Sequence, residues 1–288
     1  MSLYDLRKSY SFRNNIFNFF KMIFMIILAI FFIFPIVFMF VSSLKPEDLV
    51  AHDMTSLYAF VPRQVSLQNY IDVFHEMPFL RFLFNSSLIV GSIVFFGIFV
   101  NSMIAYSLSR LQWKGRNIIL GIIISLMIIP FEAISIPLLL EMNKFKLLDT
   151  YFVQIIVFIA SPFYIFLFYQ FFLGIPRDIE TAAKIDGAKY PLIFFRIILP
   201  LSKPVIATVA ILCFIKQWGD FLWPLLVTRG FEVRPLTVAM QVFFGGRYPR
   251  VWGDIMAFAS MITIPVLIVF LLFQKWFIKS VASTGLKG

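Results

Sequence analysis

The sequence has few charged residues for its length. Of its 288 residues only 14% are charged, whereas 60% are hydrophobic and 38 are Phe. A single water-soluble core cannot hide that much apolar side-chain surface, because the surface of a soluble protein needs many more polar and charged groups. The scarcity of charge therefore excludes a soluble globular domain and indicates a chain that is solvated by lipid.

Side chains that carry chemistry are also scarce. A metal site or a catalytic triad needs clustered ligands or a nucleophile beside a base, and the two histidines, His52 and His75, share one predicted loop. No glycine-rich segment ends in Gly-Lys-Ser or Gly-Lys-Thr, the element that wraps ATP phosphates with backbone amides. The single Cys213 has no disulfide partner in the chain and is interpreted as a small packing residue. The sequence thus predicts no catalytic residue, no metal site and no cofactor in this chain.

Long apolar runs predict an all-α membrane protein of about six transmembrane helices. Crossing the hydrocarbon takes about 20 apolar residues in a helix. Four runs contain no charge, and two further helices are predicted where proline or polar residues interrupt the pattern. The predicted helices cover residues 22–44, 82–109, 117–140 and 151–176, a run that starts near Pro204, and residues 255–274. Pro130 and Pro137 predict a kink or break in the second half of residues 117–140.

The positions of Lys and Arg predict the orientation in the membrane. With the N-terminus inside, the inner segments carry 15 of the 25 basic residues but only 4 of the 15 acidic residues. Basic residues stay preferentially on the cytoplasmic side of short loops, so both termini are predicted to be cytoplasmic. Residues 216–254 are an exception, with five basic residues on the predicted outer side. The predicted inner segments are residues 1–21, 109–117, 173–203 and 275–288.

The same pattern defines the predicted domain organisation. Residues 1–21 form a cytoplasmic tail, residues 22–277 form the transmembrane domain with a coupling loop at 174–203, and residues 278–288 form a second cytoplasmic tail. The net charge of +10 does not indicate nucleic acid, because the basic residues are spread over four inner segments rather than gathered in one stripe.

The centres of the predicted helices are nearly free of charge. Ion-coupled carriers usually keep ionisable residues deep in the membrane, where these residues carry the coupling ion. Here Glu132 and Asp220 come nearest, and both fall toward predicted outer ends. The energy for transport is therefore expected to come from another subunit. An ion-coupled secondary transporter or channel stays open as the alternative.

The predicted cytoplasmic loop at 174–203 contains a short helix with marked ends. Pro176 stands before it, Asp178 is a candidate N-cap, and Gly187 suits the left-handed conformation that stops a helix. About ten residues span roughly 15 Å, which is too short to cross a bilayer. Glu180 and Lys184 are four residues apart in the order that favours an ion pair. The small alanines between them would let another protein approach closely, while the composition alone favours an amphipathic helix that rests on the membrane surface.

This segment resembles the EAA motif of permeases in ATP-binding-cassette importers, whose pattern is roughly Glu-Ala-Ala, two residues, Asp-Gly-Ala, then Ile-x-Leu-Pro. Thr181 stands where the motif has Glu, and Glu180 lies one place earlier. The resemblance implies that the helix at 178–188 couples the membrane domain to an ATPase subunit. The matching positions are Ala182, Ala183, Asp186, Gly187, Ala188, Ile197, Leu199 and Pro200.

Other fragments resemble the carbohydrate branch of that family, in particular the shorter permease chain of maltose-type importers. The segment from Trp218 to Pro224 is similar to that branch's Trp-Asn-Asp-x-x-Trp-Pro sequence, with Gly219 in place of Asn. The remaining fragments are Asn85-Ser86, Ala105-Tyr106 with Arg110, the two prolines of residues 117–140, and the C-terminal Gly285-Leu-Lys-Gly288.

The resemblance also implies the partners and the substrate class. The partners are a second permease chain in a heterodimer, two ATPase subunits that bind ATP and Mg²⁺, and an extracytoplasmic solute-binding protein. The substrate is expected to be a sugar or oligosaccharide, although a non-sugar solute such as a polyol phosphate stays open. Polar groups near or within helices must avoid lipid, so some are candidates to line the substrate pathway. The candidates are Asn101, Glu132, Gln217 and Asp220; joining helices together is their alternative role.

Two further features lie on the predicted outer side. Residues 45–81 form a long loop that is expected either to dock the solute-binding protein or to cap the outer gate. Trp218, Trp223 and Trp252 are interpreted as anchors at the membrane interface.

Overall fold

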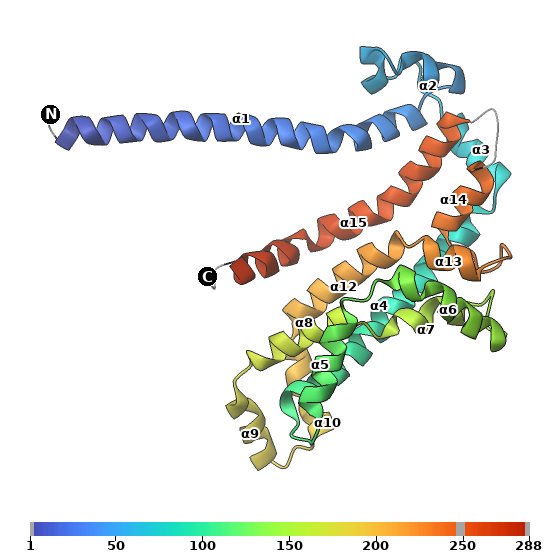
Figure 1. The fold of residues 1–288 in the computed structure, drawn as a ribbon. Coiled ribbons are helices and arrows are strands. Elements are labelled where there is room, and N and C mark those ends of the chain that lie inside the picture. The colour runs from blue at the N-terminus through green and yellow to red at the C-terminus, as the bar shows by residue number, and fades with distance from the viewer. Residues whose placement is uncertain (1–2, 246–250, 286–288) are drawn as a thin grey trace. The chain divides into compact units, whose positions relative to one another are not determined.

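The chain folds into helices. The structure is a computed structural model that describes residues 3–245 and 251–285, and it describes side chains for residues 17–245 and 251–274. No strand occurs within these ranges. The prediction of an all-α protein is therefore confirmed, and Figure 1 shows the order of the helices along the chain.

The first of two compact units comprises residues 1–77 and 247–261. Its predicted outer loop is not a plain connection, because short helices and side-chain contacts organise it. The elements of this unit are α1 (Leu3–Ser43), α2 (Glu47–Asp53), η1 (Leu57–Phe60), α3 (Gln68–Glu76) and the first part of α15 (Trp252–Gly285).

Buried polar groups hold this first unit together. The Lys45 ammonium is 3.5 Å from the Asp53 carboxylate and donates to the carbonyl of Tyr58 at 2.6 Å. The Asn69 amide donates to the carbonyls of Ser43 and Lys45, which the end of α1 leaves without helical partners. These bonds fix the start of the loop against the end of α1.

The second unit comprises residues 78–246 and 262–288. Its elements are α4 (Phe79–Arg110), α5 (Arg116–Leu126), α6 (Phe131–Lys144), α7 (Tyr151–Ile159), α8 (Pro162–Leu173), α9 (Arg177–Ile185), α10 (Tyr190–Ile193), the π-helix η2 (Phe194–Ile198), α11 (Leu199–Leu201), α12 (Lys203–Trp218), α13 (Leu222–Val227), α14 (Leu236–Phe244) and the rest of α15.

Six candidate spans result, three straight and three bent. The straight ones are residues 17–43, 79–110 and 252–274. The pair α5 and α6 is bent by 102°, which places the break where Pro130 predicted it. The pair α7 and α8 is bent by 41°, and the segment from α10 to α12 is bent by 76°. The count of about six transmembrane helices is confirmed.

The uninterrupted helix predicted for residues 151–176 is wrong, because the chain breaks after Ile159. Pro162 at the start of α8 has no N–H, so the helical ladder cannot continue through it. The Asn101 side chain pairs with the two groups that the break frees: its amide donates to the carbonyl of Ile159, and its oxygen accepts from the N–H of Ser161. The same amide also donates to the carbonyl of Gly97, one turn earlier in α4. A buried side chain of α4 therefore replaces the missing backbone bonds.

The predicted domain boundaries fall inside helices. Residue 21 lies within α1, and residue 277 lies within α15, so neither tail is set apart by a helix end. The last three residues of the C-terminal fragment, 286–288, lie outside the described residues.

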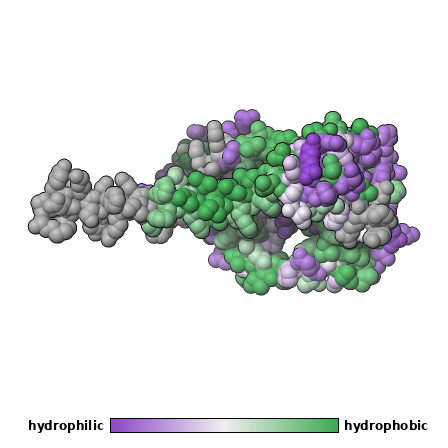
Figure 2. All heavy atoms as spheres, turned by 90° about the horizontal axis from the view of Figure 1, so that it is seen from above, coloured by the Kyte–Doolittle hydropathy of each residue, from purple (hydrophilic) through white to green (hydrophobic). Residues whose placement is uncertain are grey.

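The core of the second unit lies where α4 packs against α8 and α12. Phe168, Phe172 and Ile193 are fully buried in it, and Cys213 is buried among them, as its interpretation as a packing residue requires. The outside of the chain is different. Hydrophobic side chains cover broad areas of the surface in Figure 2, and no residue of α5 is buried. Such a surface suits lipid or a partner chain rather than water.

The Asn101 contacts generate a stability prediction. Replacing Asn101 with Leu leaves two part-buried backbone groups unpaired, the carbonyl of Ile159 and the N–H of Ser161, each at a cost of roughly 1–3 kcal/mol. Thermal unfolding in detergent is expected to show a clearly lower Tm for N101L. The exposed Asn117→Leu serves as the matched control; equal Tm values for the two variants would contradict this role.

Candidate functional site

The motif resemblance leads to α9, which lies at one end of the second unit beyond α8 and α10 (Figure 1). Its C-terminal end has the geometry that the sequence predicted. Gly187 has φ of +81°, the N–H of Gly187 donates to Lys184, and the N–H of Ala188 donates to Ala183. This pair of bonds is the Schellman motif, which needs a residue in the left-handed conformation. Gly187 therefore ends the helix as predicted.

The predicted N-terminal cap is wrong. The helix begins at Arg177, its N-cap position is Pro176, and no side chain caps it. Asp178 lies within the first turn instead, together with Glu180. A carboxylate in the first turn still interacts favourably with the helix dipole. The prediction of an acidic residue near the start of the helix was therefore right, although Asp178 lies inside the first turn rather than at the N-cap.

The two long faces of α9 differ in burial. Glu180 is 5% exposed and Ala183 is 8% exposed, so these two residues face the rest of the unit. Thr181 and Ala182 are exposed, and Ile185 is 81% exposed despite being apolar. The two alanines therefore do not form one exposed surface of small side chains. Ala182 lies on the open face of α9, whereas Ala183 faces the rest of the unit.

Glu180 forms its ion pair with a different residue from the one the sequence suggested. Its Oε1 atom lies 3.3 Å from Nε of Arg110, the last residue of α4, and both side chains are buried. Lys184 instead lies over the ring of Tyr190, with Nζ 4.7 Å from the ring centroid. The expected pair of Glu180 with Lys184 is replaced by a tertiary contact that no spacing rule predicts.

Arg110 also binds the end of α8. Its Nη2 atom donates to the carbonyl of Phe172, in the last turn of α8, and to the carbonyl of Ile175, just beyond the end of that helix. One guanidinium thus joins α4, α8 and α9. The planar fork of Arg suits this task, because several N–H groups point in fixed directions.

The rest of the motif runs back into the core. Ala188, Ile197 and Leu199 pack against the core cluster, whereas Asp186 and Pro200 are exposed. The π-helix η2 lies in this stretch, and such irregular turns are frequent at functional sites.

The structure brings together two of the four predicted pathway residues. Gln217 and Asp220 line one small cavity of about 20 Å³, enough for a single water molecule. Asn101 does not line this cavity, because its side chain bonds to the backbone at the helix break described above. Glu132 is exposed and does not line the cavity either. The other polar residues that line the cavity are Ser86, Gln154 and Thr237.

Gln154 was missed by the sequence reasoning. It donates to the carbonyls of Thr150 and Val233, and it is fully buried. Its signal was present in the sequence, because it is a lone amide near the start of an otherwise apolar run. The interpretation of Trp218 and Trp223 as anchors at the membrane interface is wrong. Trp223 is fully buried and Trp218 is 7% exposed, so neither side chain reaches the interface.

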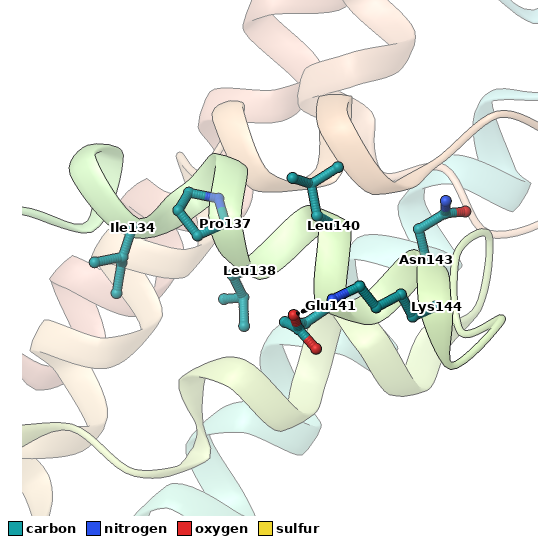
Figure 3. Close-up of a pocket in the computed structure, with 7 residues that line it drawn as sticks. All are labelled: Ile134, Pro137, Leu138, Leu140, Glu141, Asn143 and Lys144. Atoms are coloured by element: carbon teal, nitrogen blue, oxygen red, sulfur yellow. Dashed lines mark hydrogen bonds and ion pairs between the residues drawn. The ribbon is translucent and has the colours of Figure 1, made fainter.

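A second hollow, of about 690 Å³, lies along α6 and is open to the surface (Figure 3). Its lining is mostly apolar and includes Pro137, while Lys144 donates to Glu141 at its rim. None of the predicted pathway residues lines it.

Asp220 lies beyond the end of α12, outside the candidate spans. Burial raises the pKa of its carboxyl from 3.8 to about 6, although the N–H of Trp223 and the charge of Lys216 oppose part of this shift. Asp220 is therefore the titratable group of the cavity near neutral pH.

Comparisons with known proteins agree with this architecture. Residues 93–283 match the model of a family described as the binding-protein-dependent transport system inner membrane component. This chain belongs to that family. It is accordingly a permease, the membrane component of a transport system, and a permease of this kind is a transport subunit rather than an enzyme.

Relatives match this permease over nearly its whole length. It is 34% identical to the arabinooligosaccharides transport system permease AraQ of Bacillus subtilis, over 92% of this chain and 94% of that protein. It is 31% identical to the trehalose/maltose transport system permease MalG of Thermococcus litoralis, over 91% of this chain and 94% of that protein. A crystal structure of a bacterial ABC transporter involved in alginate import aligns with a TM-score of 0.82 and 27% identity, over 92% of this chain and 98% of that one.

The environment of Asp220 generates a prediction on pH. Because the folded protein holds this proton more tightly than the unfolded chain, the contribution of Asp220 to the stability of the permease falls as pH rises from about 4 to about 6. Asp220→Asn removes this contribution. Tm values measured in detergent across that range are expected to fall less steeply for D220N than for the wild type and for the exposed control D48N; identical slopes in all three proteins would contradict the assignment.

Proposed function

We propose that this permease imports a sugar or oligosaccharide, and that α9 is the helix through which separate ATPase subunits drive it. The observation that carries the proposal is the construction of α9. One face is fixed to the unit by the buried pair of Glu180 with Arg110, while the other face is open and includes an apolar residue, Ile185. A fixed helix with an open, partly apolar face is suited to bind another protein.

In this proposal the motif residues have two kinds of role. Thr181 and Ala182 belong to the open face that the ATPase subunit contacts, and Asp186 lies at its exposed end. Glu180 and Ala183 fix the helix from behind. Gly187 and Ala188 end it, and Leu199 and Pro200 carry the chain back toward the membrane. ATP and Mg²⁺ bind to the partner subunits.

The substrate class rests on the relatives. Those with named substrates transport arabino-oligosaccharides or trehalose and maltose, and the solved structure belongs to a system that imports alginate. We therefore propose a sugar or oligosaccharide as the substrate here. The polar cavity near Gln217 and Asp220 is the candidate part of the pathway in this chain.

The partner set follows the same reasoning. A second permease chain pairs with this one in a heterodimer, two ATPase subunits bind inside, and an extracytoplasmic solute-binding protein docks outside. The unburied apolar side chains of α5 support a covering chain or lipid. Residues 45–81 are the proposed docking region, and residues 45–77 of it fold within the first unit, which gives them a defined surface. Both termini face the cytoplasm of a bacterial inner membrane.

Purification tests the proposal as a whole. The tagged chain is extracted gently from its native membrane, the co-purifying proteins are identified, and ATP hydrolysis is assayed. We expect a second permease and an ATPase pair, with hydrolysis stimulated by a solute-binding protein loaded with sugar. A lone or homo-oligomeric chain that moves solute without ATP would overturn the proposal in favour of a secondary transporter.

Gly187 provides a test of α9 itself. A Cβ atom at this position meets no atom within 4 Å, so the left-handed backbone is the main obstacle to Gly187→Val, at a cost of about 1–3 kcal/mol. We expect G187V to insert normally and to lose most uptake in vesicles. Gly121→Val is the matched control, because that site is equally open and lacks a positive φ; full uptake by G187V would exclude the coupling role.

The open face can be tested by blocking it. Ala182→Trp adds bulk at an exposed position, so the permease is expected to fold while it retains much less of the ATPase subunits during co-purification. Ala51→Trp, at an exposed position in α2, controls for the added side chain. Equal retention by the two variants would show that this face is not the contact.

A further inference from the structure

The helix α4 contacts α9 at one end and a long loop segment at the other. It runs without proline from Phe79 to Arg110, 32 residues in all. At 1.5 Å for each residue this is about 48 Å. Along its length it packs against α7, α8 and α12, with Ile89, Ile93 and Tyr106 buried in between. A continuous and well-packed helix moves as one body, because packed interiors deform little.

The end at Arg110 is tied to α9 by the buried ion pair with Glu180. Aromatic rings seal this junction, since Tyr106 packs edge-on against Phe172 and tilted against Phe194. Separating the pair would leave a buried charge without a partner, which is strongly unfavourable. When α9 is displaced, α4 is therefore expected to move with it, because breaking the contact between Glu180 and Arg110 would be less favourable.

The opposite end of α4 holds the segment between α13 and α14. The Asn85 amide donates to the carbonyls of Glu232 and Arg234, at 3.0 and 2.8 Å. The hydroxyl of Ser86 accepts from the N–H of Leu236 at 2.9 Å. Side chains of α4 thus bind two carbonyls of the irregular segment before α14 and the first N–H of α14, so this segment follows the movement of α4.

We infer that α4 transmits the state of the coupling helix to the segment 232–236, with Arg110 as the positioning residue at one end and Asn85 at the other. This inference rests on the proposed function, and it names the path by which ATPase subunits on one side sense a solute-binding protein on the other. Arg110 touches neither ATP nor substrate; it acts through Glu180.

The test uses the assembled transporter with its partner subunits in lipid. ATP hydrolysis is measured with and without the loaded solute-binding protein, and the ratio of the two rates is the readout. Arg110→Met and Asn85→Ala are each expected to lower this ratio by roughly fivefold or more, the lower end of typical coupling between sites. Arg116→Met and Ser87→Ala are the matched controls, because their polar groups bond only to the backbone nearby.

A purely structural role would lower both rates together with the amount of assembled complex and leave the ratio unchanged, and that result would overturn the inference. The double variant R110M/E180M guards against misfolding, because it leaves no buried charge unpaired. It is expected to assemble and still to show a reduced ratio; a normal ratio in this assembled variant would also overturn the inference.

Combining the two ends tests whether they share one path. If α4 is the path, R110M/N85A lowers the ratio no further than the stronger single variant, whereas independent effects multiply. Multiplying effects would contradict the inference. A failure of the proposed function gives a different result, because no ATPase subunits would then co-purify with the wild type. If instead R110M keeps a normal ratio while G187V loses uptake, only the role of α4 is overturned.

Discussion

Every backbone N–H and C=O group within the hydrocarbon needs a partner inside the protein, because lipid offers none. Straight helices meet this requirement alone, but this permease interrupts its helices at several places. At three helix ends a buried polar side chain pairs with backbone groups there. Asn101 does so at the break before α8, Arg110 at the end of α8, and Asn69 at the end of α1. The few polar residues of an apolar sequence are therefore concentrated where the helical ladder ends.

The same constraint links structure to function. A side chain that satisfies the carbonyls of a neighbouring helix also joins the two helices, so the places where the backbone is irregular become the places where helices move together. Arg110 satisfies α8 and simultaneously pairs with Glu180 of α9. Asn85 satisfies the segment before α14 from the far end of the same helix. In our proposal the coupling path of the permease is therefore built from contacts that membrane folding already required.

Features of α9 that depend on neighbouring residues were predictable, and those that depend on distant residues were not. Gly187 stops α9 as expected, since its conformation follows from local backbone sterics. The pairing of Glu180 with Lys184 was wrong, because a partner on another helix competes with every local one and Arg110 offers a buried and sealed environment. The tryptophans were misjudged for a similar reason: Trp223 finds its partner in the carbonyl of Val153 and is buried by the chain itself.

The sequence by itself determined the all-α membrane fold, the approximate number of spans, the break near Pro130 and the end of the coupling helix. Hydrophobic run length, proline and glycine act within a few residues, and the sequence displays them directly. Only the tertiary structure decided which face of α9 is open, that residues 151–176 are broken, and that Gln217 and Asp220 share a cavity whereas Asn101 and Glu132 do not line it. These features depend on which helices become neighbours, and that choice is made by packing over the whole chain.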